Sequence, residues 1–234
     1  MSRTESKPKR SFSKLSSPEV KHELERLLND PPYPQYRDAM RKLGEQLGVA
    51  AKLHLDHRKP FALVTTPEDA DFLTRGMLTS LPRARARLAC YWTERHHFTG
   101  RADVATVTQS FVDPQMPKRL ETVVIAKSII SSGCIVRTNL EEFLTAVQPE
   151  RILIAAPVML AGADDQLRAE FPESISKRFV FITFATDTVR DGPTVRPGVG
   201  GQVEERLGLK GRSDRFSPEL VKEWRAAQHA SAHA

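Results

Sequence analysis

The sequence predicts an α/β fold with a mostly parallel sheet that helices cover on both faces. Two observations support this prediction. Several short segments are apolar without interruption, which is typical of strands that are buried on both sides. Segments with the spacing of amphipathic helices separate them, as in α/β proteins. With 234 residues, of which 40% are hydrophobic, the chain is also long enough to bury a sizeable core.

Two helices are predicted ahead of the first strand. Ser16 and Glu19 have the spacing of a capping box, and Pro18 suits the first turn of a helix that ends before Pro31. A second amphipathic helix follows, and its apolar stripe is Tyr36, Met40, Leu43 and Leu47. We therefore expect a basic flexible arm over residues 1–15 and a helical segment over residues 16–60.

Strands and helices alternate from residue 61 onwards. Apolar runs predict strands over residues 61–65, 83–92, 121–126, 151–157 and 178–184. Helices are predicted after a Thr66 cap, after the loop at 127–134, over 163–171 and from about Ser217. We expect an α/β domain over residues 61–210 and a C-terminal helix and tail over residues 211–234.

The positive charge of the chain is concentrated near its N-terminus. The 35 basic and 29 acidic residues give a formal charge of +6. Residues 1–60 hold 13 basic and 8 acidic residues, so this segment supplies 13 − 8 = +5 of the total. A basic arm suits a nucleic acid or an acidic protein, although a solvated tail has the same composition. The candidate contacts in the arm are Lys7, Lys9, Arg10 and Lys14.

Three further arginines are candidate nucleic-acid contacts. Arg83, Arg85 and Arg87 alternate with alanines, so on a strand their guanidinium groups would share one face and could grip phosphates. We favour the alternative, in which they form a solvent-facing strand end that prevents edge-to-edge pairing.

Several classes of protein and site are disfavoured. No apolar run is long enough to span a bilayer, and no apolar stretch follows the basic start, so we expect neither a membrane protein nor a secretory signal. Two cysteines cannot build a disulfide framework, which favours a cytoplasmic protein. The histidine pairs at 54/57 and 96/97 lack the partners of a zinc motif, and no metal site is expected.

One segment has the general arrangement of a phosphate-binding site. The predicted strand at 121–126 leads through a loop of small residues into a helix, whose backbone N–H groups suit an anion. The loop residues in question are Lys127, Ser131, Ser132, Gly133 and Cys134. A loop with a single glycine is a weak signal on its own.

Residues 61–208 resemble uracil phosphoribosyltransferases, which have the type I phosphoribosyltransferase fold. Four blocks occur in the order of that family: ADFLTRGMLTSLPRARARLACYW, VVIAKSIISSGCIV, ILIAAPVMLAGADDQLRAEFPESISKRFVFITFATD and TVRPGVGGQVEERLGL. The second block resembles the loop that binds 5-phosphoribosyl diphosphate (PRPP). The fourth resembles the uracil loop, which implies a base-binding role for Val195, Pro197, Gly198, Val199, Gly200 and Gly201.

The departures from the family pattern fall on its charged positions. Glu68 stands where the resemblance implies an arginine that holds pyrophosphate, and Thr93 stands where it implies a second arginine. Lys127 replaces the acidic residue that contacts ribose and orders the metal-bound substrate. An acid beside pyrophosphate converts attraction into repulsion, and each lost donor slows the reaction. We therefore expect no catalytic residues here.

These observations lead to one favoured hypothesis and two alternatives. The favoured hypothesis is a catalytically degenerate homologue, a pseudoenzyme that is reused as a regulatory protein binding a nucleotide-like anion, RNA or DNA, with no cofactor. The first alternative is an active enzyme that makes UMP from uracil and PRPP with Mg²⁺. The second is a structural subunit with no small-molecule ligand. A homodimer is implied by the resemblance alone.

Overall fold

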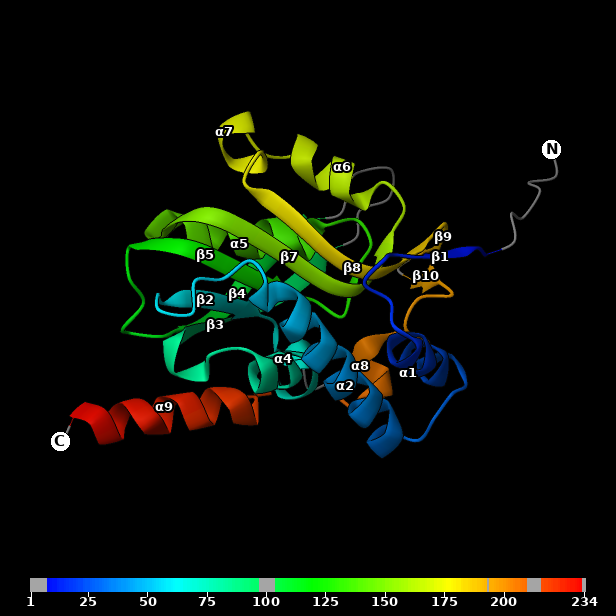
Figure 1. The fold of residues 1–234 in the computed structure, drawn as a ribbon, viewed down its shortest axis with the longest axis horizontal. Coiled ribbons are helices and arrows are strands. Elements are labelled where there is room, and N and C mark those ends of the chain that lie inside the picture. Colours follow the sequence, from blue (N-terminus) through cyan, green and yellow to red (C-terminus); the bar gives the residue numbers. More distant parts are fainter. Residues whose placement is uncertain (1–7, 97–103, 193, 210–215, 233–234) are drawn as a thin grey trace.

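A computed structural model describes residues 8–96, 104–192, 194–209 and 216–232. Within this part of the chain, a sheet has the strand order β1-β8-β7-β5-β2-β3-β4, and β6 pairs with β7 (Figure 1). The strands from β8 to β3 in this order are parallel, whereas β1 and β4 pair antiparallel at the two edges. The predicted mostly parallel sheet is confirmed. The strands are β1 Arg10–Phe12, β2 Phe61–Thr65, β3 Ala86–His96, β4 Val104–Val112, β5 Arg119–Ala126, β6 Ile129–Ile130, β7 Gln148–Leu160 and β8 Phe179–Asp187.

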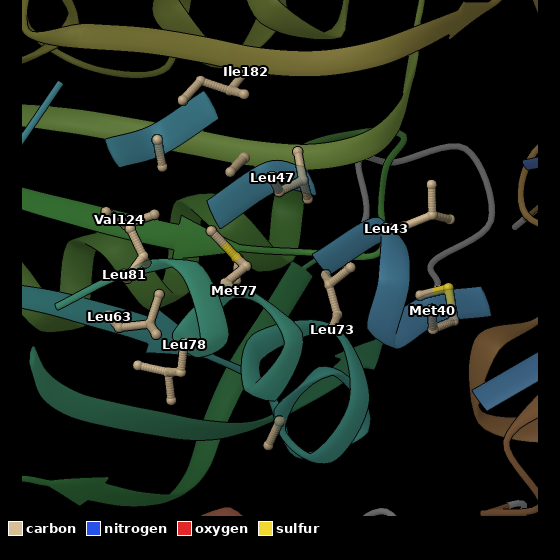
Figure 2. Close-up of a cluster of buried hydrophobic side chains, with 14 of the residues drawn as sticks. Met40, Leu43, Leu47, Leu63, Leu73, Met77, Leu78, Leu81, Val124 and Ile182 are labelled. Atoms are coloured by element: carbon tan, nitrogen blue, oxygen red, sulfur yellow. The ribbon is translucent and has the colours of Figure 1, made fainter. Parts of the chain in front are cut away.

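Helices cover both faces of the sheet. Successive residues of a strand point to opposite sides, so a strand that is apolar throughout has two apolar faces to bury. On β2, Leu63 belongs to a core cluster with α1, α2, α4 and α9, whereas Ala62 and Val64 belong to a second cluster with α5 and α6. Figure 2 shows the first cluster, in which Leu47 and Met77 face the sheet. These helices are α1 Pro18–Leu28, α2 Tyr33–Lys52, α4 Arg75–Ser80, α5 Cys134–Ala146, α6 Ala163–Ala169 and α9 Glu219–Ala232.

Short elements connect the layers. A π-helical turn, Ala70–Thr74, links α3 to α4, and a small β9–β10 ribbon follows β8. The bounds are α3 Pro67–Asp69, α7 Glu173–Ser176, α8 Val203–Arg206, β9 Val189–Asp191 and β10 Thr194–Arg196. None of the described helices combines the length and the hydropathy that crossing a membrane requires.

Two glycines allow α2 to pack backbone against backbone with α4 and with the π-helical turn that precedes it. A Cβ atom added to Gly44 would lie 2.0 Å from the carbonyl oxygen of Leu73, and one added to Gly76 would lie 2.0 Å from that of Arg41. No side chain fits in this space. The N-terminal helices are therefore built into the core of the α/β domain and share its largest buried cluster.

The arginine-rich segment differs from its prediction. Arg83–Arg85 is a 3₁₀ turn, and β3 begins only at Ala86. The guanidinium of Arg83 lies 5.4 Å from the ring centroid of Trp224 and 3.4 Å from Glu223 Oε2, so α9 holds this turn out of the sheet. The prediction of Arg83, Arg85 and Arg87 along one strand face is therefore wrong, since only Arg87 lies on the strand.

Both edge strands were missing from the sequence predictions. β4 has mostly exposed side chains, and a strand that buries so little lacks the apolar run used to predict strands. β1 lies inside the segment expected to be a flexible arm, but it pairs with β8 and its Arg10 bonds to the buried Asp187. The arm prediction is therefore wrong for residues 10–12, and Lys7 lies outside the described residues.

Substituting Gly76 with alanine tests the close packing of α2 and α4. Helix propensity alone would stabilise the protein by about 1 kcal/mol, but the Cβ atom would overlap a backbone carbonyl. We expect Gly76→Ala to lower the free energy of unfolding by about 1–3 kcal/mol, measured by urea denaturation. The control is Ala226→Gly on the exposed face of α9, the reverse exchange of these two residues at a site without close packing. It should lower the free energy of unfolding by about 1 kcal/mol through helix propensity alone. A Gly76→Ala protein as stable as the wild type would contradict the packing.

Candidate functional site

The carboxyl ends of β2 and β5 mark the topological switch point of the sheet. The chain passes from β2 to β3 on one side, and the next parallel strand, β5, lies on the other side of β2. In open α/β sheets, ligands bind outside the carboxyl ends of the strands at such a point. The two loops that leave β2 and β5, at residues 66–69 and 127–133, are therefore the first place to examine.

A buried ion cluster joins these two loops. Lys127 Nζ lies 2.6 Å from Glu68 Oε1 and 2.6 Å from Asp69 Oδ2. It also donates to Thr66 Oγ1 at 3.3 Å. Lys127 is 8% exposed and Asp69 is 1% exposed, so water cannot replace these contacts. We call Lys127, Glu68 and Asp69 the ion cluster.

The surrounding backbone holds Asp69 in place. Its Oδ1 atom accepts a hydrogen bond from the backbone N–H of Ser128, and its Oδ2 atom accepts one from the Thr66 hydroxyl. Thr66 was predicted to cap the following helix, but its side chain makes no capping bond to the backbone. Its hydroxyl instead donates to Asp69 and accepts from Lys127.

The pKa values in the cluster reflect burial opposed by attraction. Burial favours the neutral amine of Lys127, yet the charges of Asp69 and Glu68 raise its pKa above the ordinary value. Burial also raises the pKa of the Glu68 carboxyl, but Lys127 outweighs it and the pKa is lowered. For Asp69, burial outweighs Lys127 and the pKa is raised. Lys127 is thus a cation at neutral pH whose charge is directed at two carboxyl groups.

The predicted phosphate-binding loop lies beside this cluster. Gly133 adopts a left-handed conformation (φ +72°) at the start of α5, and as the N-cap residue it supplies no side-chain hydrogen bond to the helix. Among the residues that the structure describes, the buried Ser132 hydroxyl has no hydrogen-bond partner, and Ser131 lines the adjacent cleft. Cys134 is buried as the first residue of the helix. The loop therefore keeps an uncapped helix N-terminus, although Lys127 turns away from it towards the carboxylates.

The predicted base-binding loop is fixed by hydrogen bonds from distant elements. Asp187 accepts from the backbone N–H of Gly198 at 2.7 Å, and Arg10 donates to the carbonyl oxygen of the same residue. The Tyr36 hydroxyl donates to the carbonyl oxygen of Val199 at 2.8 Å. A Cβ atom on Gly200 would lie 1.9 Å from the Leu27 carbonyl oxygen. The N-terminal helices and β1 thus set the path of this loop, in which the bond before Pro197 is cis.

A cleft of about 520 Å³ lies where the two loops meet. The predicted phosphate-binding loop and α5 line one side with Ser131, Ile129 and Ile135. The predicted base-binding loop lines the other side with Val195 and Gly201. The end of β3 supplies Thr93, Glu94, Arg95 and His96, and Glu68 of the ion cluster also reaches it. The structure thus brings both predicted loops to one cavity.

Arg95 is a cleft residue that the sequence reasoning missed. Alternation along β3 puts it on the same face as Thr93, whose hydroxyl donates to Asn139 Oδ1 of α5 at 2.6 Å. The Nε atom of Arg95 is buried and has no hydrogen-bond partner within the described part of the chain. Thr93 was identified as the position of a lost arginine, and reading two residues further on the same face would have found this cation.

The predicted nucleic-acid contacts do not converge on the cleft. Lys9 and Lys14 are exposed near β1, and the Arg10 guanidinium forms an ion pair with Asp187. Arg83 contacts α9, as described above. Among the described residues, no group of three histidine, cysteine or acidic side chains is arranged to hold a metal ion.

Comparisons with known proteins show the fold alone. No protein-family model and no curated protein matches the chain. The AQ2163 protein from Aquifex aeolicus has a similar structure, with a TM-score of 0.68 and 18% identity over 86% of this chain and 99% of that one.

Two further solved structures are more distant. A hypoxanthine-guanine phosphoribosyltransferase from Bacillus anthracis has a TM-score of 0.39 and 8% identity over 53% of this chain and 70% of that one. A Neisseria gonorrhoeae hypothetical protein with bound ppGpp has a TM-score of 0.39 and 15% identity over 74% of this chain and 91% of that one. At these scores neither likeness extends to function, and the likeness to uracil phosphoribosyltransferases stays an interpretation of the sequence.

Removing the Lys127 ammonium tests the ion cluster. Lys127→Met leaves two buried carboxyl groups without their cation, and we expect a loss of about 3–5 kcal/mol in the free energy of unfolding at pH 7. In the variant, burial alone raises the folded-state pKa values of Glu68 and Asp69 above their unfolded values. The folded variant then takes up protons before the unfolded chain does, so lowering the pH towards about 4 should restore part of its stability.

The measurement is urea denaturation of both proteins between about pH 7 and pH 4. The difference in unfolding free energy between wild type and Lys127→Met should shrink as the pH falls. A difference that is constant or grows would show that the carboxyl groups do not depend on this ammonium.

Proposed function

We propose that this chain is a phosphoribosyltransferase-like protein that binds a nucleotide-like anion in the cleft and does not catalyse phosphoribosyl transfer. In this proposal it acts as a binding or regulatory protein. The observation that carries the proposal is the ion cluster at the switch point, where Lys127 contacts both Glu68 and Asp69.

The ion cluster supports the proposal that the chain does not catalyse phosphoribosyl transfer. By the resemblance, the loop after β2 should present a cation to the diphosphate, and the loop after β5 should present a carboxylate to the ribose and the metal-bound substrate. Here the charges of the two loops are the reverse of those that the resemblance implies. Lys127 Nζ lies 2.6 Å from Glu68 Oε1, so the two charges neutralise each other. A diphosphate at this point would meet the Glu68 carboxylate, and a magnesium ion would meet the Lys127 ammonium. Both encounters are repulsive.

The part of the cleft beside the α5 N-terminus offers donors to a single phosphate group, while the carboxylates of Glu94 and Glu204 line other parts of its wall. The uncapped N-terminus of α5 offers backbone N–H groups, Ser131 offers a hydroxyl, and Arg95 offers a guanidinium in the same cavity. Ile129 and Val195 add apolar surface against which a base can lie. These features support a nucleoside monophosphate better than a diphosphate donor.

Binding and turnover are measured separately. We expect calorimetric titration with UMP to show binding, and we expect no UMP from uracil, PRPP and Mg²⁺ above the level in buffer. Turnover at ordinary enzyme rates, about 1 s⁻¹ or faster, would overturn the loss of catalysis. Absence of binding by UMP and PRPP would overturn the nucleotide site and favour the structural-subunit alternative.

Arg95 provides the sharpest test of the anion site. Losing a hydrogen bond to a charged group costs about 1.5–3 kcal/mol, so Arg95→Gln should weaken UMP binding roughly 10- to 100-fold. Arg87→Gln is a matched control, because Arg87 lies on the same strand but bonds to the carbonyl oxygen of Ala86 away from the cleft. Equal affinities for the two variants would contradict a role for Arg95.

A further inference from the structure

A basic groove lies at the amino ends of the parallel strands, opposite to the cleft at their carboxyl ends. It is formed at the amino ends of β5, β7 and β8 and by the segment before β2. Its volume is about 530 Å³, and Leu120 and Pro149 form part of its lining. We define the basic groove by its cationic residues: Lys59, Arg119 and Arg178 in the lining, with Lys118, Arg151 and Lys177 beside them in the chain or on β7.

The cations of the groove outnumber its acids. Six basic residues face two carboxylates, those of Glu121 and Glu150, which leaves 6 − 2 = +4. Glu121 Oε2 lies 2.7 Å from Lys59 Nζ, and its other oxygen lies 4.0 Å from Arg151. In the described part of the chain, no carboxylate lies within ion-pair distance of Lys118, Arg119 or Lys177, and all three are exposed. This charge is not neutralised within the fold.

The positions of these cations are set by the sheet. The backbone N–H of Gln148 donates to the carbonyl oxygen of Lys118, and that of Ile152 donates to the carbonyl oxygen of Arg178. The guanidinium of Arg178 donates to the carbonyl oxygen of Pro149 at 2.9 Å. The groove therefore rests on the ends of rigid strands.

The spacing points to a ligand with several phosphates. Lys118 and Arg119 form one basic pair at the start of β5, and Lys177 and Arg178 form another just before β8. Both strands pair with β7, which separates the two basic pairs by two strand spacings. Arg119 lies opposite Gln148 and Phe179 lies opposite Ile152, so the pairs are also offset by about three residues along β7, and their backbones are about 14 Å apart. A chain of phosphates can cross from one basic pair to the other and contact both, and Arg119 and Arg178 line the same groove.

We propose that the basic groove binds the phosphate backbone of a single-stranded nucleic acid. Cations on strand ends supply the sequence-independent attraction that dominates such binding. The lining has no aromatic side chain among the described residues, so the groove holds the backbone without reading bases. The proposal is independent of the cleft, because the two sites lie at opposite ends of the parallel strands.

Fluorescence anisotropy tests the proposal on the full chain. The probe is a labelled single-stranded RNA of about 20 nucleotides, titrated at several KCl concentrations. We expect Lys118→Glu/Arg119→Glu to weaken binding at least about 10-fold and to reduce the salt slope by about 1.4, which corresponds to two phosphate contacts. Lys177→Glu, on the other side of β7, should also weaken binding.

The matched control is Lys21→Glu/Lys222→Glu, which changes the net charge by the same amount at exposed positions of α1 and α9. It should retain affinity within about threefold of the wild type. Equal losses in both double variants, a loss confined to the control, or no salt-dependent binding by the wild type would overturn the proposal. Thermal unfolding of each variant checks its fold. UMP should not displace the RNA, so failure of the cleft proposal would leave this result unchanged.

Discussion

One buried ammonium, that of Lys127, connects the two loops around which the cleft is built. Burial of a cation and two carboxyl groups is costly unless each has a partner. Here the Ser128 backbone N–H and the Thr66 hydroxyl complete the bonding of Asp69, while Lys127 reaches Glu68. The loop after β2 and the loop after β5 therefore cannot move apart without exposing an unpaired charge. This constraint fixes one wall of the cleft.

A second constraint fixes the opposite wall. The predicted base-binding loop, residues 195–201, has little regular structure of its own, and its conformation depends on groups from the start of the chain. Arg10 bonds to Asp187 and to the loop, Tyr36 bonds to Val199, and Leu27 packs against Gly200 without space for a side chain. The N-terminal segment is thus a support for the site, which explains why its helices share the core of the α/β domain.

The fold could be predicted from the sequence where burial leaves a recognisable pattern of apolar residues. The predicted strand at 61–65 matches β2, because a strand buried on both faces has an apolar residue at every position. β4 lacks that pattern because its outer side chains are exposed, and β1 has only three residues. Arg83 and Arg85 alternate as on a strand, but their local sequence could not show that α9 packs against the turn.

The site was predictable in its charges and not in their pairing. The resemblance singled out Glu68 and Lys127, yet 58 residues or more separate the lysine from its two partners, and only the strand order brings them together. Arg95 was missed because its role depends on which face of β3 meets α5.

A double-mutant cycle on Glu68 and Lys127 tests the central claim most directly. The free energies of unfolding of the wild type, Glu68→Gln, Lys127→Met and the double variant are measured at pH 7. If the ammonium and the carboxylate stabilise each other across the two loops, the coupling energy is about 1–3 kcal/mol. Additive effects, with a coupling energy below about 0.5 kcal/mol, would show that the loops are held by other contacts and would contradict the account.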